Sequence, residues 1–310
     1  MTDQTRDAFV NGLRRAAAAW FAERGYQVDP KHPYCLADHD DWPQNIIDKK
    51  VVEYVEHWRD KRRLCTGKEP PLHKYLHHGL SSQAMVLNLV GPLIVGNDLS
   101  PLLSVLEAHG MSHLDGHVTP VLEYEDISVF REVGHQPTSL DLVLKDQSGP
   151  RVFVEAKLSE PGFGGCSVHH RGACDGQNPV SDLSRCYLHQ KKKRLYWKLL
   201  DEQGFLDGPI ADDPFCVLAE HYQFFRELCF AIHFGGRFVV LADERNPSFF
   251  GSDAATDHGL IGSLLRMVPA GLHAQVSQVS VQQVVAAIKG MGRPPWISEF
   301  EAKYGLGDSV

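Results

Sequence analysis

One stretch of the sequence places two carboxylates and a lysine where they could act together. Asp141 lies in a segment of alternating apolar and polar residues, and Glu155 and Lys157 share one face of a second such segment. The residues between the segments, 146–150 (DQSGP), have the composition of a turn. Because Asp141 and Glu155 each lie seven residues from Ser148, a hairpin centred there sets the two carboxylates opposite each other.

Two carboxylates that face each other across a hairpin repel, and a divalent cation between them removes that repulsion. Mg²⁺, or Mn²⁺ in its place, prefers one or two carboxylates together with water and phosphate oxygens. Lys157 would then hold an attacking water or stabilise charge on a phosphate. The alternative interpretation is a solvated strand edge with a cross-strand ion pair and no catalytic role.

A run of cations, residues 189–194 (HQKKKR), follows the hairpin. We expect it on a helix over 181–201, with Arg185, His189, Lys192 and Tyr196 on one face. Such a face could bind phosphates, although a charge run on a helix is as often only solvated. The candidate contacts to substrate here are Gln190, Lys191 and Lys192. A second basic cluster, His57 with 61–63, is interpreted as surface.

The segment after the hairpin carries cysteine and histidine residues with zinc-like spacing. Cys166, His169, Cys174 and Cys186 could form a tetrahedral structural Zn²⁺ site in a long loop rich in glycine. The alternative, which we favour, is that Cys166 and Cys186 are buried thiols. The chain has seven cysteines, an odd number at irregular spacing, which indicates reduced thiols and a cytoplasmic protein.

The composition permits an enzyme without naming one. The chain has 310 residues, with 31 Lys and Arg against 39 Asp and Glu, so its formal charge is −8. A hydrophobic fraction of 43% excludes a disordered chain, and the negative charge gives no general argument for binding nucleic acid. No run approaches eighteen apolar residues, so no membrane span is expected. The zincin, serine-hydrolase, dinucleotide and phosphate-loop motifs are absent from the sequence.

The element order predicts an α/β protein. Helices are expected over 4–26, 43–64, 81–94, 181–201 and 216–234, strands over 121–129, 139–145, 151–158 and 237–243, and a helical tail ending near Trp296. Residues 66–71 (TGKEPP) look like a linker. We therefore divide the chain into an N-terminal helical extension (1–70), a core (71–250) with a loop insertion at 159–182, and a C-terminal helical extension (251–310).

The hairpin resembles the active site of the PD-(D/E)XK nuclease superfamily. Asp141 followed after thirteen residues by Glu155-Ala156-Lys157 matches its signature, with Leu140 where the family has proline. The surrounding sequence, roughly residues 75–250, is similar to an uncharacterised bacterial branch of that superfamily. The similar segments are LSSQAMVLNLVGPL (80–93), HQPTSLDLVL (135–144), VEAKLSEPGFGGC (154–166), HYQFFRE (221–227) and VVLADERNPSF (239–249).

This resemblance implies a restriction-endonuclease-like αβββαβ core with a mixed sheet and extra helices at both ends. It also implies phosphodiester hydrolysis, with Asp141, Glu155 and the carbonyl of Ala156 as metal ligands and Lys157 as the group that orients water. Gln83 stands where members often have an acidic residue on the first core helix. Gln190 and Tyr196 are six residues apart, so the Gln-Tyr motif of RecB-like members is not transferred.

We therefore expect a metal-dependent nuclease acting on nucleic acid, with DNA favoured over RNA. Many nucleases of this fold dimerise, and a homodimer is compatible with the sequence. The alternative is a non-catalytic module on the same fold that binds nucleic acid or another partner through the 189–194 run.

Overall fold

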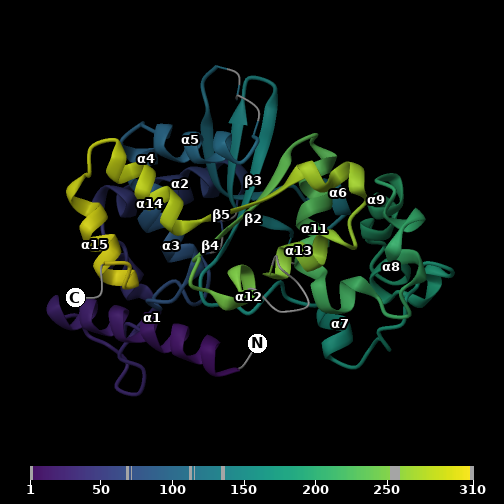
Figure 1. Ribbon diagram of the computed structural model, residues 1–310, viewed down its shortest axis with the longest axis horizontal. Coiled ribbons are helices and arrows are strands. Elements are labelled where there is room, and N and C mark those ends of the chain that lie inside the picture. Colours follow the sequence, from purple (N-terminus) through teal and green to yellow (C-terminus); the bar gives the residue numbers. More distant parts are fainter. Residues whose placement is uncertain are drawn as a thin grey trace.

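A mixed sheet of five strands forms the centre of the protein, in the order β1-β2-β3-β4-β5 (Figure 1). The computed structural model describes residues 3–67, 70, 72–111, 114, 116–133, 137–251 and 259–307. The first three strands are antiparallel neighbours, whereas β3, β4 and β5 run parallel. The strands are β1 (Thr119–Glu125), β2 (Ser139–Asp146), β3 (Gly149–Lys157), β4 (Arg237–Ala242) and β5 (Val276–Ser280). The predicted α/β class with a mixed sheet is confirmed.

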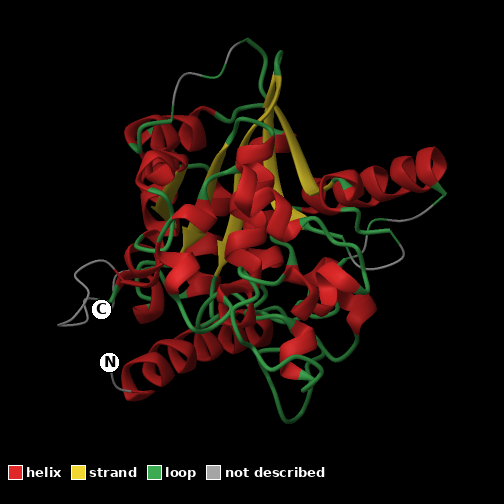
Figure 2. Cartoon of the chain, turned by 90° about the vertical axis from the view of Figure 1, so that its right-hand side faces the viewer, coloured by secondary structure: helices red, strands yellow, loops and turns green. Residues whose placement is uncertain are grey.

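Helices cover both faces of the sheet, as Figure 2 also shows. One face packs against α2 (Lys49–Thr66), α3 (Ser82–Leu89), α4 (Gly91–Val95), α5 (Ser100–Ala108), α14 (Val281–Gly290) and α15 (Pro295–Tyr304). The other packs against α6 (Ile127–Phe130), α9 (Tyr196–Glu202), α11 (Val217–His233) and α13 (Gly259–Leu265). Val152 and Val154 of β3 enter the first cluster and Phe153 enters the second, so both faces of this strand are buried.

The remaining helices lie outside these two layers or are single turns. Helix α1 (Asp3–Glu23) packs against α15, and Arg24 forms a 2.6 Å ion pair with Glu299 of that helix. The short ones are η1 (His39–Asn45), α7 (Ser167–His170), η2 (Leu183–Arg185), α8 (Tyr187–Gln190), η3 (Phe205–Asp207), α10 (Pro209–Asp212), α12 (Pro247–Phe250) and η4 (Ala270–Gln275).

Helix α3 presents its residues to the sheet because its start is fixed by a cap. The hydroxyl of Ser81 accepts a hydrogen bond from the N–H of Ala84 at 3.2 Å. Every residue from Gln83 to Leu89 is buried, which explains why apolar residues lie on all sides of this helix. Gln83 and Asn88 are its buried polar residues, and Gln83 faces the candidate site.

Two predicted boundaries were wrong because a side chain caps a helix at another place. The helix expected over 43–64 begins only at Lys49, where Asp48 accepts a hydrogen bond from the N–H of Lys50. The strand expected over 121–129 ends at Glu125, because Asp126 caps α6 through the N–H of Ser128. Of the predicted linker 66–71, residues 68, 69 and 71 lie outside the described part of the chain.

The helix expected over 181–201 was also wrong. It is divided into η2, α8 and α9, and Lys193 between α8 and α9 has a φ of 53° in the left-handed region. The tail contains the strand β5, which the prediction missed, and its last helix continues past Trp296 to Tyr304. β5 pairs with β4 of the predicted core, and the domain boundaries themselves stay a prediction.

None of the described helices is by itself long and apolar enough to cross a membrane. One pair, Ser82–Val95 with Ser100–Ala108, has the required length and composition only when the two are taken together, and it is bent by 117°.

Candidate active site

The β2–β3 hairpin brings Asp141 and Glu155 to neighbouring positions. The register pairs Leu142 of β2 with Val154 of β3. Asp141 and Glu155 are the next residues along these antiparallel strands, so they lie opposite each other. Asp141 is half-buried, and its Oδ2 accepts a hydrogen bond from the N–H of Ala156 at 2.8 Å. Its Oδ1 takes no hydrogen bond from any residue that the structure describes. One oxygen of Asp141 is therefore available to a ligand.

Lys157 and Glu155 form a closed network with Gln223 of α11. The Lys157 ammonium donates to Glu155 Oε1 at 2.7 Å and to Gln223 Oε1 at 2.9 Å. The amide nitrogen of Gln223 donates to the same Glu155 Oε1 at 2.6 Å. Both charged side chains are buried, with 4% and 5% of Lys157 and Glu155 exposed. The network fixes the two groups that the hairpin contributes, and it leaves Glu155 Oε2 outside these hydrogen bonds.

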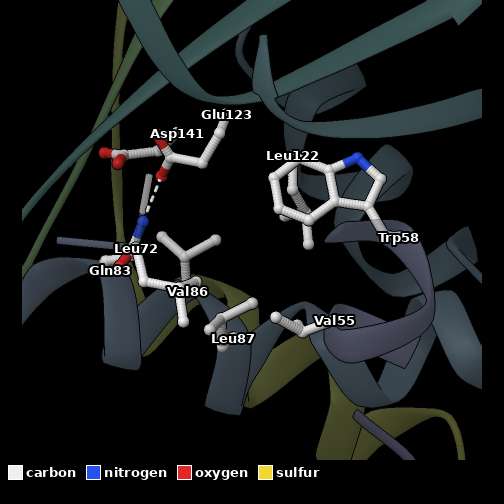
Figure 3. A pocket seen from close by; sticks show the side chains of 9 residues that line it. All are labelled: Val55, Trp58, Leu72, Gln83, Val86, Leu87, Leu122, Glu123 and Asp141. Carbon is white, nitrogen blue, oxygen red and sulfur yellow. Dashed lines mark hydrogen bonds between the residues drawn. The ribbon is translucent and has the colours of Figure 1, made fainter. Parts of the chain in front are cut away.

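A third carboxylate, Glu123 of β1, lies beside Asp141 (Figure 3). Glu123 has a φ of 46° within its strand, a conformation that is costly for a non-glycine residue. Its Oε1 accepts from the amide nitrogen of Gln83 at 2.6 Å, and its Oε2 accepts from the hydroxyl of Ser139 at 2.9 Å. The amide oxygen of Gln83 in turn accepts from the N–H of His73 at 2.9 Å. Gln83 thus orients a carboxylate of the site.

The charges of these carboxylates are not balanced within the site. Burial, together with the charges of Glu155 and Glu123, raises the pKa of Asp141 well above its usual range. Burial raises the pKa of Glu123 to about 7. Burial and the charge of Glu155 also raise the pKa of Glu227, whose two oxygens are buried and have no hydrogen-bond partner among the described residues. Burial opposes the charge on Lys157, but Glu155 and other acidic neighbours outweigh it and raise the pKa of that ammonium.

The residues present fit a small hard cation. A cavity of about 10 Å³ opens beside Asp141, Glu123 and Gln83, with Trp58 on its apolar wall (Figure 3). This is the space of about one water molecule. Its oxygen donors and excess negative charge suit Mg²⁺ or Mn²⁺. No group of three or more His, Cys, Asp or Glu side chains within the described ranges has an arrangement that could hold a metal, so the oxygen donors of this cavity are Asp141, Glu123 and Gln83. Glu155 does not line the cavity, and its role as a ligand stays a prediction.

Glu123, Gln223 and Glu227 were missed by the sequence analysis. Gln223 and Glu227 stand in HYQFFRE, one of the segments on which the family resemblance rested, so a signal for them was present in the sequence. No comparable signal marked Glu123, because its position depends on how β1 pairs with β2. The N–H of Ala156, rather than its carbonyl, contacts Asp141, and the predicted role of that carbonyl as a ligand stays a prediction.

Comparison with protein families supplies the decisive observation. The model of the family described as "restriction endonuclease associating with ARP" matches residues 14–305, nearly the whole chain. The chain belongs to this family. None of the curated proteins and none of the solved structures compared with the chain matches it. A restriction-endonuclease-like family agrees with the coarse prediction from the hairpin, and membership of the PD-(D/E)XK superfamily stays a prediction.

In this family member the basic run begins at the end of α8, with His189 and Gln190, and continues in a turn rather than along one helix face. Gln190, Lys191 and Lys192 are exposed, and Lys193 takes the left-handed conformation that ends the run. Tyr196 is buried, and its hydroxyl donates to Glu132 at 2.6 Å, so it cannot share a solvent face with Lys192. The helical face predicted for Arg185, His189, Lys192 and Tyr196 is therefore corrected. Contacts of Gln190, Lys191 and Lys192 with substrate stay a prediction.

The cysteine-rich loop of this restriction-endonuclease family member has no described group of metal ligands. His169 Nδ1 lies 3.2 Å from the carbonyl oxygen of Cys174. Cys166 is buried and Cys186 is half-buried, both as free thiols. Zinc ligation by Cys166, His169, Cys174 and Cys186 stays a prediction, and the geometry gives it no support.

Proposed function

We propose that the protein is a metal-dependent nuclease that hydrolyses phosphodiester bonds, with DNA favoured as substrate. The family assignment supports a nuclease-like function. The observation that carries the finer proposal is the crowding of three carboxylates: Asp141 and Glu123 line a small cavity, and Glu155, paired with the buried Lys157, raises the pKa of Asp141. Buried carboxylates without a balancing cation are costly, and a divalent cation would balance Asp141 and Glu123.

In this proposal Asp141 and Glu155 hold Mg²⁺ or Mn²⁺ through the oxygens that are outside their internal hydrogen bonds. The bound cation stabilises charge on the phosphate and lowers the pKa of a water molecule. Glu123, held by Gln83 and Ser139, adds negative charge next to Asp141 and orients water in the cavity.

Lys157 has the role of positioning the nucleophile. Its ammonium is kept charged by Glu155 and is held by Gln223, so it remains a donor over the whole physiological pH range. A fixed ammonium next to the phosphate stabilises the negative charge that builds up during in-line attack.

The test is cleavage of single- and double-stranded DNA and RNA in Mg²⁺ or Mn²⁺. Asp141→Asn and Glu155→Gln should each lower cleavage by at least about 100-fold, because each removes a charge from the site. Glu202→Gln, which changes an exposed carboxylate of α9, is the matched control and should cleave as the wild type does. Circular dichroism spectra would establish that the variants are folded.

One observation favours the alternative of a non-catalytic binding module. The ion pair between Lys157 and Glu155 is complete without a cation, as in an inert hairpin. A folded wild type that binds nucleic acid but cleaves none of the four substrates would support that alternative. Equal cleavage by wild type and Asp141→Asn would instead contradict the assignment of the site.

A further inference from the structure

A row of imidazole and phenol rings lies on the surface next to the candidate active site. The ring centroids of His39 and His77 are 5.7 Å apart, and those of His77 and His78 are 4.4 Å apart. Tyr75 lies 4.8 Å from His78 and 5.4 Å from His73. The five rings, His39, His77, His78, Tyr75 and His73, form an uninterrupted series that we call the ring surface.

The backbone under the ring surface is held by buried hydrogen bonds. The amide nitrogen of Asn45, a fully buried residue, donates to the carbonyls of Leu76 and His78 at 2.6 and 2.8 Å. The N–H of Gly79 donates to the carbonyl of Tyr34 at 2.8 Å. A surface fixed in this way loses little conformational entropy when a ligand binds.

Two of the five rings are open to solvent and have cations beside them, and His39, His77 and His78 are half-buried. His73 and Tyr75 are exposed, the latter to 45%. The ammonium of Lys74 lies 4.6 Å from the centre of the Tyr75 ring, and Lys31 is exposed on the neighbouring loop. Burial and the neighbouring His77 lower the pKa of His78 to about 4, so this ring is neutral at pH 7. Neutral rings with lysines beside them make this part of the surface differ from the chain as a whole, which has a charge of −8.

The ring surface is joined directly to the candidate site. The N–H of His73 donates to the amide oxygen of Gln83, and the amide nitrogen of Gln83 donates to Glu123. The negative charge of Glu160, which accepts from the N–H of Leu158 at the end of β3, also acts on His73. His73, at one end of the ring surface, therefore lies next to Gln83 and Glu123 of the candidate site.

We propose that the ring surface binds unpaired nucleotides of a nucleic acid strand and guides that strand to the candidate site, an inference that rests on the proposed nuclease function. Exposed rings bind bases by stacking, and flanking lysines bind the backbone phosphates. The bases of a duplex are already stacked on each other and cannot offer their faces, so the substrate class is single-stranded nucleic acid or a single-stranded end.

Binding in EDTA tests this inference without cleavage. Fluorescence anisotropy would compare a labelled 20-nucleotide DNA strand with the corresponding blunt duplex. The wild type should bind the single strand more tightly, and a double variant, His73→Ala with Tyr75→Ala, should lose about tenfold or more in affinity for it. Tyr75→Phe, which keeps the ring, should retain the binding. Phe215→Ala, which removes an exposed ring before α11, is the matched control and should bind as the wild type does.

The inference is overturned if the folded double variant binds the single strand as tightly as the wild type does. Tighter binding of the duplex by the wild type, or no binding of either DNA, overturns it as well. The two proposals fail in different ways. If the rings are needed for binding but Mg²⁺ produces no cleavage, the nuclease proposal fails. If cleavage depends on Asp141 but binding does not depend on the rings, only the ring surface is wrong.

Discussion

Replacing Glu123 by glutamine should change how the stability of the protein depends on pH. The usual pKa of a glutamate is 4.5, and burial raises that of Glu123 to about 7 in the folded state. Between these values the folded state holds more protons than the unfolded state, so the free energy of unfolding falls as the pH rises. The stabilisation is complete below pH 4.5 and is lost above pH 7. Glutamine does not titrate and stays neutral throughout.

The size of the effect follows from the two pKa values. Linkage gives a loss of about 2–3 kcal/mol between pH 5 and pH 8 in the wild type relative to Glu123→Gln. The amide can accept from Gln83 as the carboxylate does, although its NH₂ group must now donate to the hydroxyl of Ser139. Lys303 is buried with a pKa far below its usual range, so its contribution to the free energy of unfolding rises with pH. This contribution is the same in the wild type and in Glu123→Gln, and it cancels when the two are compared.

Urea unfolding followed by circular dichroism at four pH values from 5 to 8, in EDTA, measures this difference. Mg²⁺ added at pH 8 should stabilise the wild type more than it does at pH 5, because protons compete with the cation for the carboxylates. Parallel pH profiles of wild type and Glu123→Gln would refute the reasoning, since they would mean that Glu123 is already ionised in the folded state at pH 5.

Two further predictions concern side-chain positioning and packing. Gln223→Ala removes one hydrogen bond from Lys157 and one from Glu155, so cleavage should fall about tenfold and the free energy of unfolding by about 2–3 kcal/mol, as measured by cleavage rates and urea unfolding. Gly79→Ala would place a Cβ 2.5 Å from that of Ala17 and should lower the free energy of unfolding by at least about 2 kcal/mol. Gly12→Ala, in open space on α1, should raise it by up to about 1 kcal/mol. Thermal unfolding of the two variants measures both effects. An equal effect of both alanines would contradict the packing around Gly79.

The sequence could predict those parts of the site that depend on local pairing. Asp141 and Glu155 are symmetric about a turn, so alternation and turn composition were enough to bring them together. Gln223 reaches the same site from α11, 66 residues beyond Lys157, and only the parallel packing of β3 with β4 explains why that helix crosses there. Contacts of this range are not encoded in any local pattern.

The two elements that the sequence patterns did not predict correctly, the helix over 181–201 and strand β5, have identifiable physical causes. A run of lysines has high helix propensity, yet the left-handed Lys193 and the burial of Arg194 and Tyr196 divide that segment. Arg194 donates to the carbonyl of Arg131, so a tertiary contact decides the conformation there. Strand β5 was missed because VSQVS is short and polar on one side and leads directly into α14. Propensity could not reveal either outcome.

The last helix has a consequence for the order in which the protein can be assembled during synthesis. The phenol oxygen of Tyr304 accepts from Asn88 of α3 at 3.0 Å, and the ammonium of Lys303 donates to Asn45 Oδ1 at 2.6 Å. Asn45 also holds the segment that carries His78. Domains fold as units while ribosomes add about 5–20 residues per second. A ribosome-bound chain that has not yet released α15 therefore lacks these contacts to α3 and Asn45, and we expect this layer to reach its finished arrangement only after α15 has been added.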